Sequence, residues 1–145
     1  MKTIKEKEQE LLADFEMLPM WNDKYNYIMD MGKELPLLSE SDKNTENKVE
    51  GCQSASWLKV ENKNGKLYFT GDSEAILGKG VISMLLQLLN GQPAEKIARY
   101  DFHLIYAIDL PNHLSPTRKI GLESVMKRII ELAKSHQKQE KNERK

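Results

Sequence analysis

The sequence predicts an α+β fold in which a three-stranded antiparallel sheet packs against helices. Apolar residues recur at three- and four-residue steps in both halves of the chain, which is the period of a helix that buries one face. The middle of the chain instead carries β-branched and aromatic residues around an Asn-Gly turn. Helices, then strands, then helices again is an order typical of α+β proteins.

Composition and charge exclude several classes of protein. The 145 residues correspond to about one domain, and we treat residues 1–145 as a single unit. The 22 Lys and Arg balance the 22 Asp and Glu, so the chain lacks the basic surface of a general nucleic-acid binder. The longest apolar stretch, residues 81–89, is too short to span a bilayer, so we expect no membrane partner. The first residues lack the apolar run of a signal peptide, and one cysteine requires no oxidising compartment, so we expect a cytoplasmic protein.

The N-terminal part of the chain is expected to form two helices, at residues 4–18 and about 21–35. Pro19 interrupts the apolar stripe between them, and Pro36 ends the second. Residues 39–48 are polar and are expected to form a loop.

The middle of the chain is expected to form the sheet. Asn64-Gly65 predicts a hairpin turn, because this pair tolerates positive φ at low cost. The connection between the first two expected strands carries Cys52. The three strands are expected at about residues 46–51, 54–62 and 65–71.

Helices are expected to return after the sheet. Asp72 or Ser73 would be the N-cap of a helix at about residues 74–89. Gly78 and Gly80 lie inside it, which we interpret as a close approach of this helix to the sheet.

The C-terminal part is expected to hold two further helices and a tail. Asn90-Gly91 ends the long helix, and Pro93 begins a short one that runs to about Arg99. Ser115 and Pro116 are the cap and first residue of a last helix, and residues 134–145 are expected to be a flexible charged tail.

Cys52 is the residue that points most clearly to chemistry. A lone cysteine is more often a small buried hydrophobe, but the neighbours of this one are neither large nor apolar. Gly51 permits a tight turn, so we expect Cys52 at the tip of a strand connection. One thiol cannot hold a zinc ion or an iron–sulfur cluster, and the three histidines lack ligand spacing. We therefore expect no metal and no cofactor.

Two kinds of thiol chemistry remain open on these residues. A Cys-dependent hydrolase or thiol redox enzyme would pair Cys52 with His113, the one attractive base. A sulfur acceptor would instead attack the persulfide of another protein and carry the transferred sulfur on Cys52. The absence of a second cysteine suits the acceptor, because no second thiol of the chain can attack the Cys52 persulfide and release its outer sulfur.

Four ordered blocks of the sequence resemble the SufE family, the sulfur acceptors of cysteine desulfurases. Residues 50–57, Glu-Gly-Cys-Gln-Ser-Ala-Ser-Trp, are similar to the family's Gly-Cys-Gln-Ser-x-x-Trp hallmark. The resemblance extends over about residues 11–133, and the region 100–112 matches least. Ala55 and Ser56 stand before Trp57, where an aliphatic residue often precedes the tryptophan in the family, and these smaller side chains are expected to loosen the packing of the loop. The other three blocks are residues 21–36, 71–80 and 113–123.

The resemblance implies a fold and a function. The fold is a SufE-type α+β domain similar to the iron–sulfur scaffold IscU. The function is to take sulfur as a persulfide on Cys52 from a PLP-dependent desulfurase of the SufS or CsdA type, to stimulate that enzyme, and to pass the sulfur to the SufBCD scaffold. In the family the resting thiol tucks against an apolar cavity under its loop, which keeps it neutral until a partner draws it out. A desulfurase regulator in which the thiol is dispensable stays open as an alternative, and so does a homodimer.

Further residues are assigned supporting parts. Gly51, Gln53 and Ser54 are expected to support the loop around Cys52. Arg118 lies in the first turn of its helix, where the helix dipole disfavours a positive charge, and this misfit hints at an electrostatic partner. The expected partner contacts are Glu74, His113 and Arg118.

Overall fold

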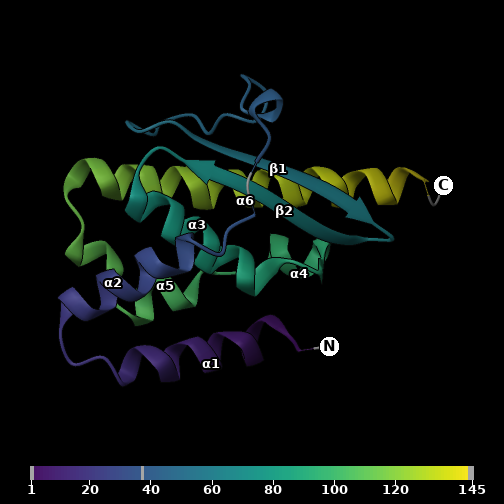
Figure 1. Ribbon diagram of the computed structural model, residues 1–145. Coiled ribbons are helices and arrows are strands. Elements are labelled where there is room, and N and C mark those ends of the chain that lie inside the picture. Colours follow the sequence, from purple (N-terminus) through teal and green to yellow (C-terminus); the bar gives the residue numbers. More distant parts are fainter. Residues whose placement is uncertain (1, 37, 144–145) are drawn as a thin grey trace.

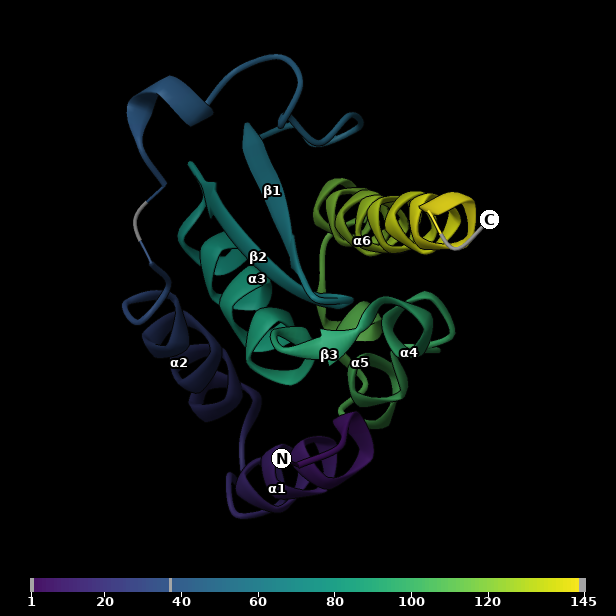
Figure 2. The ribbon, with the colours of Figure 1, turned by 90° about the vertical axis from the view of Figure 1, so that its right-hand side faces the viewer.

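The computed structural model describes residues 2–36 and 38–143. It has the predicted α+β architecture, with a three-stranded antiparallel sheet of order β1-β2-β3. Helices lie below and beside the two long strands, and the chain that precedes β1 rises above them (Figure 1, Figure 2). The strands are β1 (Ser56–Lys63), β2 (Lys66–Ser73) and β3 (Gln92–Pro93).

The β1–β2 hairpin confirms the turn predicted at Asn64-Gly65. Both residues have positive φ, 56° and 86°, which matches the twist of a two-residue hairpin. On the covered face, Leu58, Leu67 and Phe69 are buried, whereas the alternate residues Lys59, Tyr68 and Thr70 are partly exposed. One face of the hairpin therefore forms the floor of the core.

The third strand is not where the sequence analysis expected it. Residues 46–51 form only a single bridge, between Lys48 and Trp57, and the third strand is β3. Only Val49 of that segment buries an apolar side chain, and Gly51 with φ of 94° turns the chain away from β1. Gly91, with φ of 83°, instead turns the chain so that Gln92 pairs with Leu67.

The two predicted N-terminal helices are confirmed as α1 (Ile4–Glu16) and α2 (Trp21–Gly32). A capping box starts α1, because the Thr3 hydroxyl accepts from the Glu6 N–H while the Glu6 carboxylate accepts from the Thr3 N–H. The polar loop at 39–48 contains one 3₁₀ turn, η1 (Glu40–Asp42).

Helix α3 (Ile76–Leu89) forms the centre of the core and packs against both α2 and β2. The expected N-cap was wrong, because Asp72 and Ser73 belong to β2 and the cap is Ala75, which has no side-chain oxygen. Ser73 pairs in the strand instead of capping the helix, because Ser56 and Ser73 are cross-strand partners and extend the β1–β2 ladder. The Ser73 hydroxyl still accepts from the Ala75 N–H at 3.2 Å.

Glycines in α3 allow close packing, but only partly against the sheet. A Cβ on Gly78 would lie 2.8 Å from the Ser73 Oγ at the end of β2. A Cβ on Gly80 would instead lie 2.2 Å from the Ile28 carbonyl oxygen of α2, and one on Gly32 would lie 3.0 Å from the Gly80 nitrogen. The interpretation of Gly80 as a sheet contact is therefore wrong, because the close approach joins two helices.

Between Ala94 and Glu143, the chain forms four further helical segments. Helix α4 follows Pro93, and α6 begins at Pro116 after Ser115, both as predicted. Helix α6 runs beside β1 and packs against α4. It stays helical to Glu143, so the flexibility expected for 134–145 remains a prediction, and residues 144–145 lie outside the described part. The segments are α4 (Ala94–Ala98), α5 (His103–Ala107), η2 (Leu110–His113) and α6 (Pro116–Glu143).

Within residues 2–36 and 38–143, the helices are all too short or too polar to cross a bilayer.

Candidate functional site

Cys52 lies in the loop that leads into β1, and Gly51 shapes that loop. Gly51 has φ of 94°, a region that residues with a side chain rarely adopt. A Cβ at this position would also lie only 2.5 Å from the Oγ of Ser124 on α6. A glycine is therefore needed both for the turn and for the close approach of the loop to α6.

The Cys52 thiol is half-buried and packs against the hydrophobic core. Its Sγ donates a weak hydrogen bond to the Gly121 carbonyl oxygen, 3.6 Å away on α6. Burial raises the pKa of the thiol, and the hydroxyl of Ser56 acts in the opposite direction as a hydrogen-bonding group that favours the thiolate. At neutral pH the resting side chain is therefore an uncharged thiol.

An open groove of about 1060 Å³ lies beside the thiol, and we call it the Cys52 groove. Its walls come from the Cys52 loop, from α2, and from the first turns of α3 and α6. Ile76, at the start of α3, lies on its edge with 71% of its surface exposed. Predicted site residues that line the groove are Cys52, Gln53, Ser54, Glu74 and Arg118.

Gln53 and Ser54 are exposed beside the thiol. In the described part of the chain neither side chain makes a hydrogen bond, although the Ser54 carbonyl oxygen lies 3.4 Å from the Ser56 hydroxyl. Their expected support of the loop therefore stays a prediction, whereas Gly51 contacts α6 directly.

His113 does not join the other predicted site residues. Its ring stacks on Trp21 at 3.8 Å between centroids, and its Nε2 lies 3.6 Å from an Asp109 carboxylate oxygen. Its carbonyl oxygen accepts a hydrogen bond from the Tyr25 hydroxyl of α2. His113 thus ties η2 to α2, and it is not among the residues that line the Cys52 groove.

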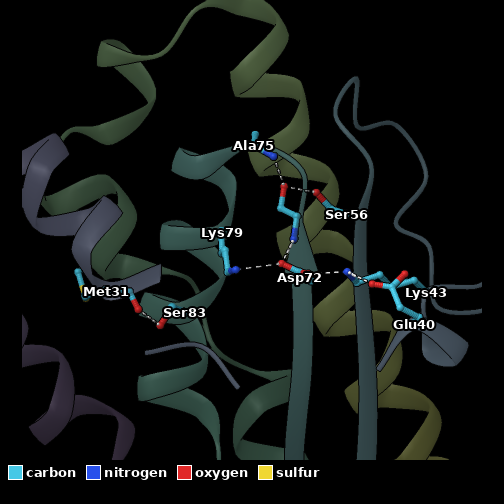
Figure 3. Close-up of polar contacts among 9 residues, drawn as sticks. Met31, Glu40, Lys43, Ser56, Asp72, Ala75, Lys79 and Ser83 are labelled. Carbon is cyan, nitrogen blue, oxygen red and sulfur yellow. Dashed lines mark hydrogen bonds and ion pairs between the residues drawn. The ribbon is translucent and has the colours of Figure 1, made fainter. Parts of the chain in front are cut away.

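Sequence analysis missed the side-chain contacts within a group of buried polar residues at the base of the loop, shown in Figure 3. Ser56 is 4% exposed, and its hydroxyl donates to the Ser73 Oγ at 2.9 Å. The strand period could have revealed Ser56, because it falls on the same face as Leu58 and is thereby expected inside.

Asp72 forms the second part of this polar group. Its carboxylate lies 3.0 Å from the Lys43 Nζ and 3.6 Å from the Lys79 Nζ, and it accepts from the Ser73 N–H (Figure 3). Burial opposes ionisation of Asp72, but these hydrogen bonds and positive charges together keep its pKa below the ordinary value. Lys43 belongs to the polar loop at 39–48, so the pair fastens that loop to β2.

Nowhere among the described residues do three or more His, Cys, Asp or Glu side chains gather as metal ligands do.

Comparison with known proteins assigns the family. The model of the family described as "SufE: Fe-S metabolism associated domain" matches residues 9–133. The chain belongs to the SufE family. An uncharacterized SufE-like protein of Rhizobium etli is 39% identical over 130 residues, which cover 86% of this chain and 88% of that protein. One of Rhizobium meliloti is 37% identical over 126 residues, covering 83% and 89%.

A solved structure shares the fold. The solution structure of a hypothetical protein from Thermus thermophilus superposes with a TM-score of 0.75 at 18% identity, and the match covers 91% of this chain and 96% of that one. At this identity the likeness shows the fold alone, and the function follows from the SufE domain. That domain supports a part in iron–sulfur metabolism, a sulfur-transfer role rather than that of an ordinary enzyme, and interaction with a cysteine desulfurase.

Proposed function

We propose that this SufE family member accepts sulfur from a cysteine desulfurase and carries it as a persulfide on Cys52. The observation that carries the proposal is a solitary thiol on a Gly-Cys loop at the edge of an open groove. A groove beside the thiol leaves room for a partner's cysteine to approach, and the bond from the thiol to the Gly121 carbonyl oxygen is weak and easily broken.

The transfer needs no cofactor and no oxidant. The Cys52 thiolate attacks the outer sulfur of the donor persulfide, and a new S–S bond forms on Cys52. The S–S bond of the donor breaks, and its electron pair stays on the donor cysteine as a thiolate. Because the sequence contains a single cysteine, no second thiol of the chain can attack the product and release sulfide.

Burial of the resting thiol fits a carrier that must avoid side reactions. A neutral, half-buried thiol reacts slowly with oxidants, because the thiolate is the reactive species. We infer that a desulfurase of the SufS or CsdA type binds along the Cys52 groove and contacts Glu74 and Arg118, which line it.

The proposal also covers the partners from which the protein receives sulfur and to which it passes it on. Residues 1–145 act as a single SufE-like domain that stimulates the desulfurase by removing its bound sulfur and hands the sulfur to a SufBCD scaffold. A cytoplasmic location and a homodimer remain predictions, as does His113 as a partner contact.

Mass measurement on the Cys52 peptide tests the proposal. Incubation of the full chain with an active desulfurase and cysteine is expected to add the mass of one sulfur atom at Cys52, and a reductant is expected to remove it. Cys52→Ser is the control and is expected to gain no mass. An unchanged wild-type mass, with the desulfurase shown to be active, would overturn the proposal.

Stimulation of the desulfurase distinguishes the carrier from a regulator. A carrier loses stimulation in Cys52→Ser, whereas a regulator with a dispensable thiol keeps it. The hydrolase or redox enzyme gains no support from the geometry, because His113 is engaged with Trp21 and Asp109.

A further inference from the structure

Two walls of the Cys52 groove are helices that lie on either side of α3. Figure 2 shows α2 on one side and α6 on the other, and α3 packs against both. Helix α2 contributes groove residues between positions 22 and 29, and the start of α6 with the residue Leu114 before it contributes residues between positions 114 and 125. The shape of the groove therefore depends on how the start of α6 is fixed relative to α2.

Three side chains meet where these two walls are joined. The His113 ring stacks on Trp21 of α2, with 3.8 Å between the ring centroids and 17° between the ring planes. The Tyr25 hydroxyl, also on α2, donates to the His113 carbonyl oxygen. Tyr25 in turn packs on Trp21, with 5.3 Å between their centroids. We call Trp21, Tyr25 and His113 the aromatic brace.

The aromatic brace carries the polar connection between the two walls. Within the described part of the chain, the bond from Tyr25 to His113 is the only hydrogen bond between α2 and residues 110–143, and no ion pair joins them. Asp109 holds the His113 ring from η2, with one carboxylate oxygen 3.6 Å from the Nε2 while the other accepts from the Asn112 side chain at 2.6 Å. Trp21 thus contacts the face of the imidazole, and Asp109 contacts its Nε2.

The wall that follows His113 carries two groups that bear on sulfur transfer. The Gly121 carbonyl oxygen accepts the hydrogen bond of the resting thiol, and Arg118 lines the groove. His113 directly precedes Leu114, the first residue of this wall, and α6 begins at Pro116. Over a few turns a helix behaves as a rigid element, so a displacement at His113 carries Arg118 and Gly121 with it.

We propose that the aromatic brace positions the α6 wall for sulfur transfer, with Trp21 and His113 fixing that wall to α2 so that the groove keeps the shape that the desulfurase meets. The inference rests on the proposed function, and it gives His113 a part other than direct contact with the partner. His113 is a positioning residue, because it acts through the places of Arg118 and Gly121 and exchanges no atoms with the sulfur. A groove already held in its binding shape needs less ordering when a partner docks.

Two tyrosines of α2 provide a matched pair of variants. The Tyr25 hydroxyl bonds to His113, whereas the Tyr27 hydroxyl donates to an Asp14 carboxylate oxygen of α1 at 2.7 Å. Tyr27 packs on Phe15 of α1 and is not among the residues that line the Cys52 groove. Tyr25→Phe and Tyr27→Phe therefore each remove one hydroxyl bond from the same helix, but only Tyr25→Phe loosens the join between the two walls.

The first experiment measures the rate at which iodoacetamide alkylates the single cysteine of the full chain, with no partner present. Tyr25→Phe, Trp21→Ala and His113→Ala are each expected to speed alkylation by about fivefold, the size of one ordinary hydrogen bond or ring stack that holds the α6 wall beside the thiol. His113→Phe, which keeps a ring on Trp21, is expected to react within about twofold of the wild-type rate. Tyr27→Phe is the control and is expected to leave the rate unchanged.

A double variant distinguishes one brace from two independent contacts. Because either single change already breaks the stack, Trp21→Ala with His113→Ala is expected to react no faster than either alone, whereas independent contacts would multiply to about 25-fold. The inference is overturned by brace variants that react at the wild-type rate, by an equal rise in Tyr27→Phe, by His113→Phe behaving like His113→Ala, or by effects that multiply in the double variant.

The second measurement uses an active cysteine desulfurase of the SufS type and varies the concentration of the carrier. The brace variants are expected to raise the KM for the carrier by about fivefold and to keep the wild-type kcat, because Cys52 itself is unchanged. A lower kcat at an unchanged KM would contradict a positioning part. A wild-type chain that gains no sulfur removes the proposed function, whereas the alkylation rates, which involve no desulfurase, decide separately whether the brace fixes the groove.

Discussion

The two ends of the β1–β2 ladder are held in different ways. At the hairpin end, Gly65 completes the turn, its N–H is bonded by the Asn62 side chain at 2.8 Å, and β3 pairs beside it. At the other end, the chain before β1 contributes one bridge, and the ion pair between Lys43 and Asp72 fastens the preceding loop. Both ends thus have backbone hydrogen bonds, but only the end that carries the thiol is also held by an ion pair between side chains of the preceding loop and β2, within the described part of the chain.

This difference shows how one small sheet can be rigid and still present a reactive loop. Backbone ladders open cooperatively, but a contact made by a few side chains can open alone. The predictions below test whether the end near Cys52 depends on those side chains, beginning with the largest expected effect.

Asp72→Ala is expected to lower the free energy of unfolding by about 2–3 kcal/mol, because it leaves two lysines without their shared carboxylate in a partly buried site. Denaturant unfolding measures the loss. Glu95→Gln, which breaks an exposed pair with Arg99, is the control and is expected to change stability by less than about 0.5 kcal/mol. Equal effects of the two variants would mean that the Asp72 ion pair does not fasten this end.

The same carboxylate predicts a pH dependence. Since the pKa of Asp72 is lowered by folding, its contribution is complete above the ordinary pKa of an aspartate and is lost as pH falls through the lower folded value. The stability gap between the wild type and Asp72→Asn is therefore expected to be constant near neutral pH and to narrow in acid. Denaturant unfolding across acidic pH measures it, and a gap that widens in acid would contradict the assignment.

Gly51→Ala is expected to cost about 2 kcal/mol and to displace the loop, because its φ of 94° and the Ser124 side chain both disfavour a Cβ. Alkylation of Cys52 is expected to become faster as the thiol leaves its site. Gly65→Ala is the matched variant at the hairpin end, with φ of 86°, and is expected to destabilise the chain without changing the alkylation rate. A thiol that responds equally to both changes would remove the distinction between the two ends.

Asn90→Ala is expected to have the smallest effect, about 1 kcal/mol, by removing bonds from its side chain to the N–H and carbonyl of Phe69. Urea unfolding measures the loss, and alkylation of Cys52 is expected to stay at the wild-type rate. A faster reaction would show that β2 transmits changes from its middle to the loop.

The parts of the fold that could be predicted from the sequence are those determined by local patterns. The hairpin could be predicted because Asn64-Gly65 determines its turn locally, and the N-terminal helices because their apolar stripes are local patterns. The third strand could not, since β3 has two residues and Pro93 is a signal for a helix start. Asp72 was misread as a helix cap because nothing local indicates its contact with Lys43, which depends on the folded loop.

In the candidate site, the sequence indicates the Gly51-Cys52 motif, but it does not indicate the contacts that the surrounding side chains make. Gly51 and Cys52 form a motif that the sequence displays, and Glu74 and Arg118 do line the same groove. His113 was grouped with them by residue type, but its stacking on Trp21 depends on how η2 meets α2. The Ser56 hydroxyl was interpreted only as a small side chain, because its partner Ser73 comes from the neighbouring strand.

The glycine contact between α2 and α3 has a consequence for how sequences of this kind can change. Gly32 and Gly80 bring two backbones together with no side chain between them, and α2 carries one wall of the Cys52 groove. The spacing of α2 and α3 beside that groove is thus set by main-chain atoms. Apolar side chains elsewhere in the interface can change while that spacing is kept, but a single methyl added at Gly80 would meet the Ile28 carbonyl oxygen and push the two helices apart.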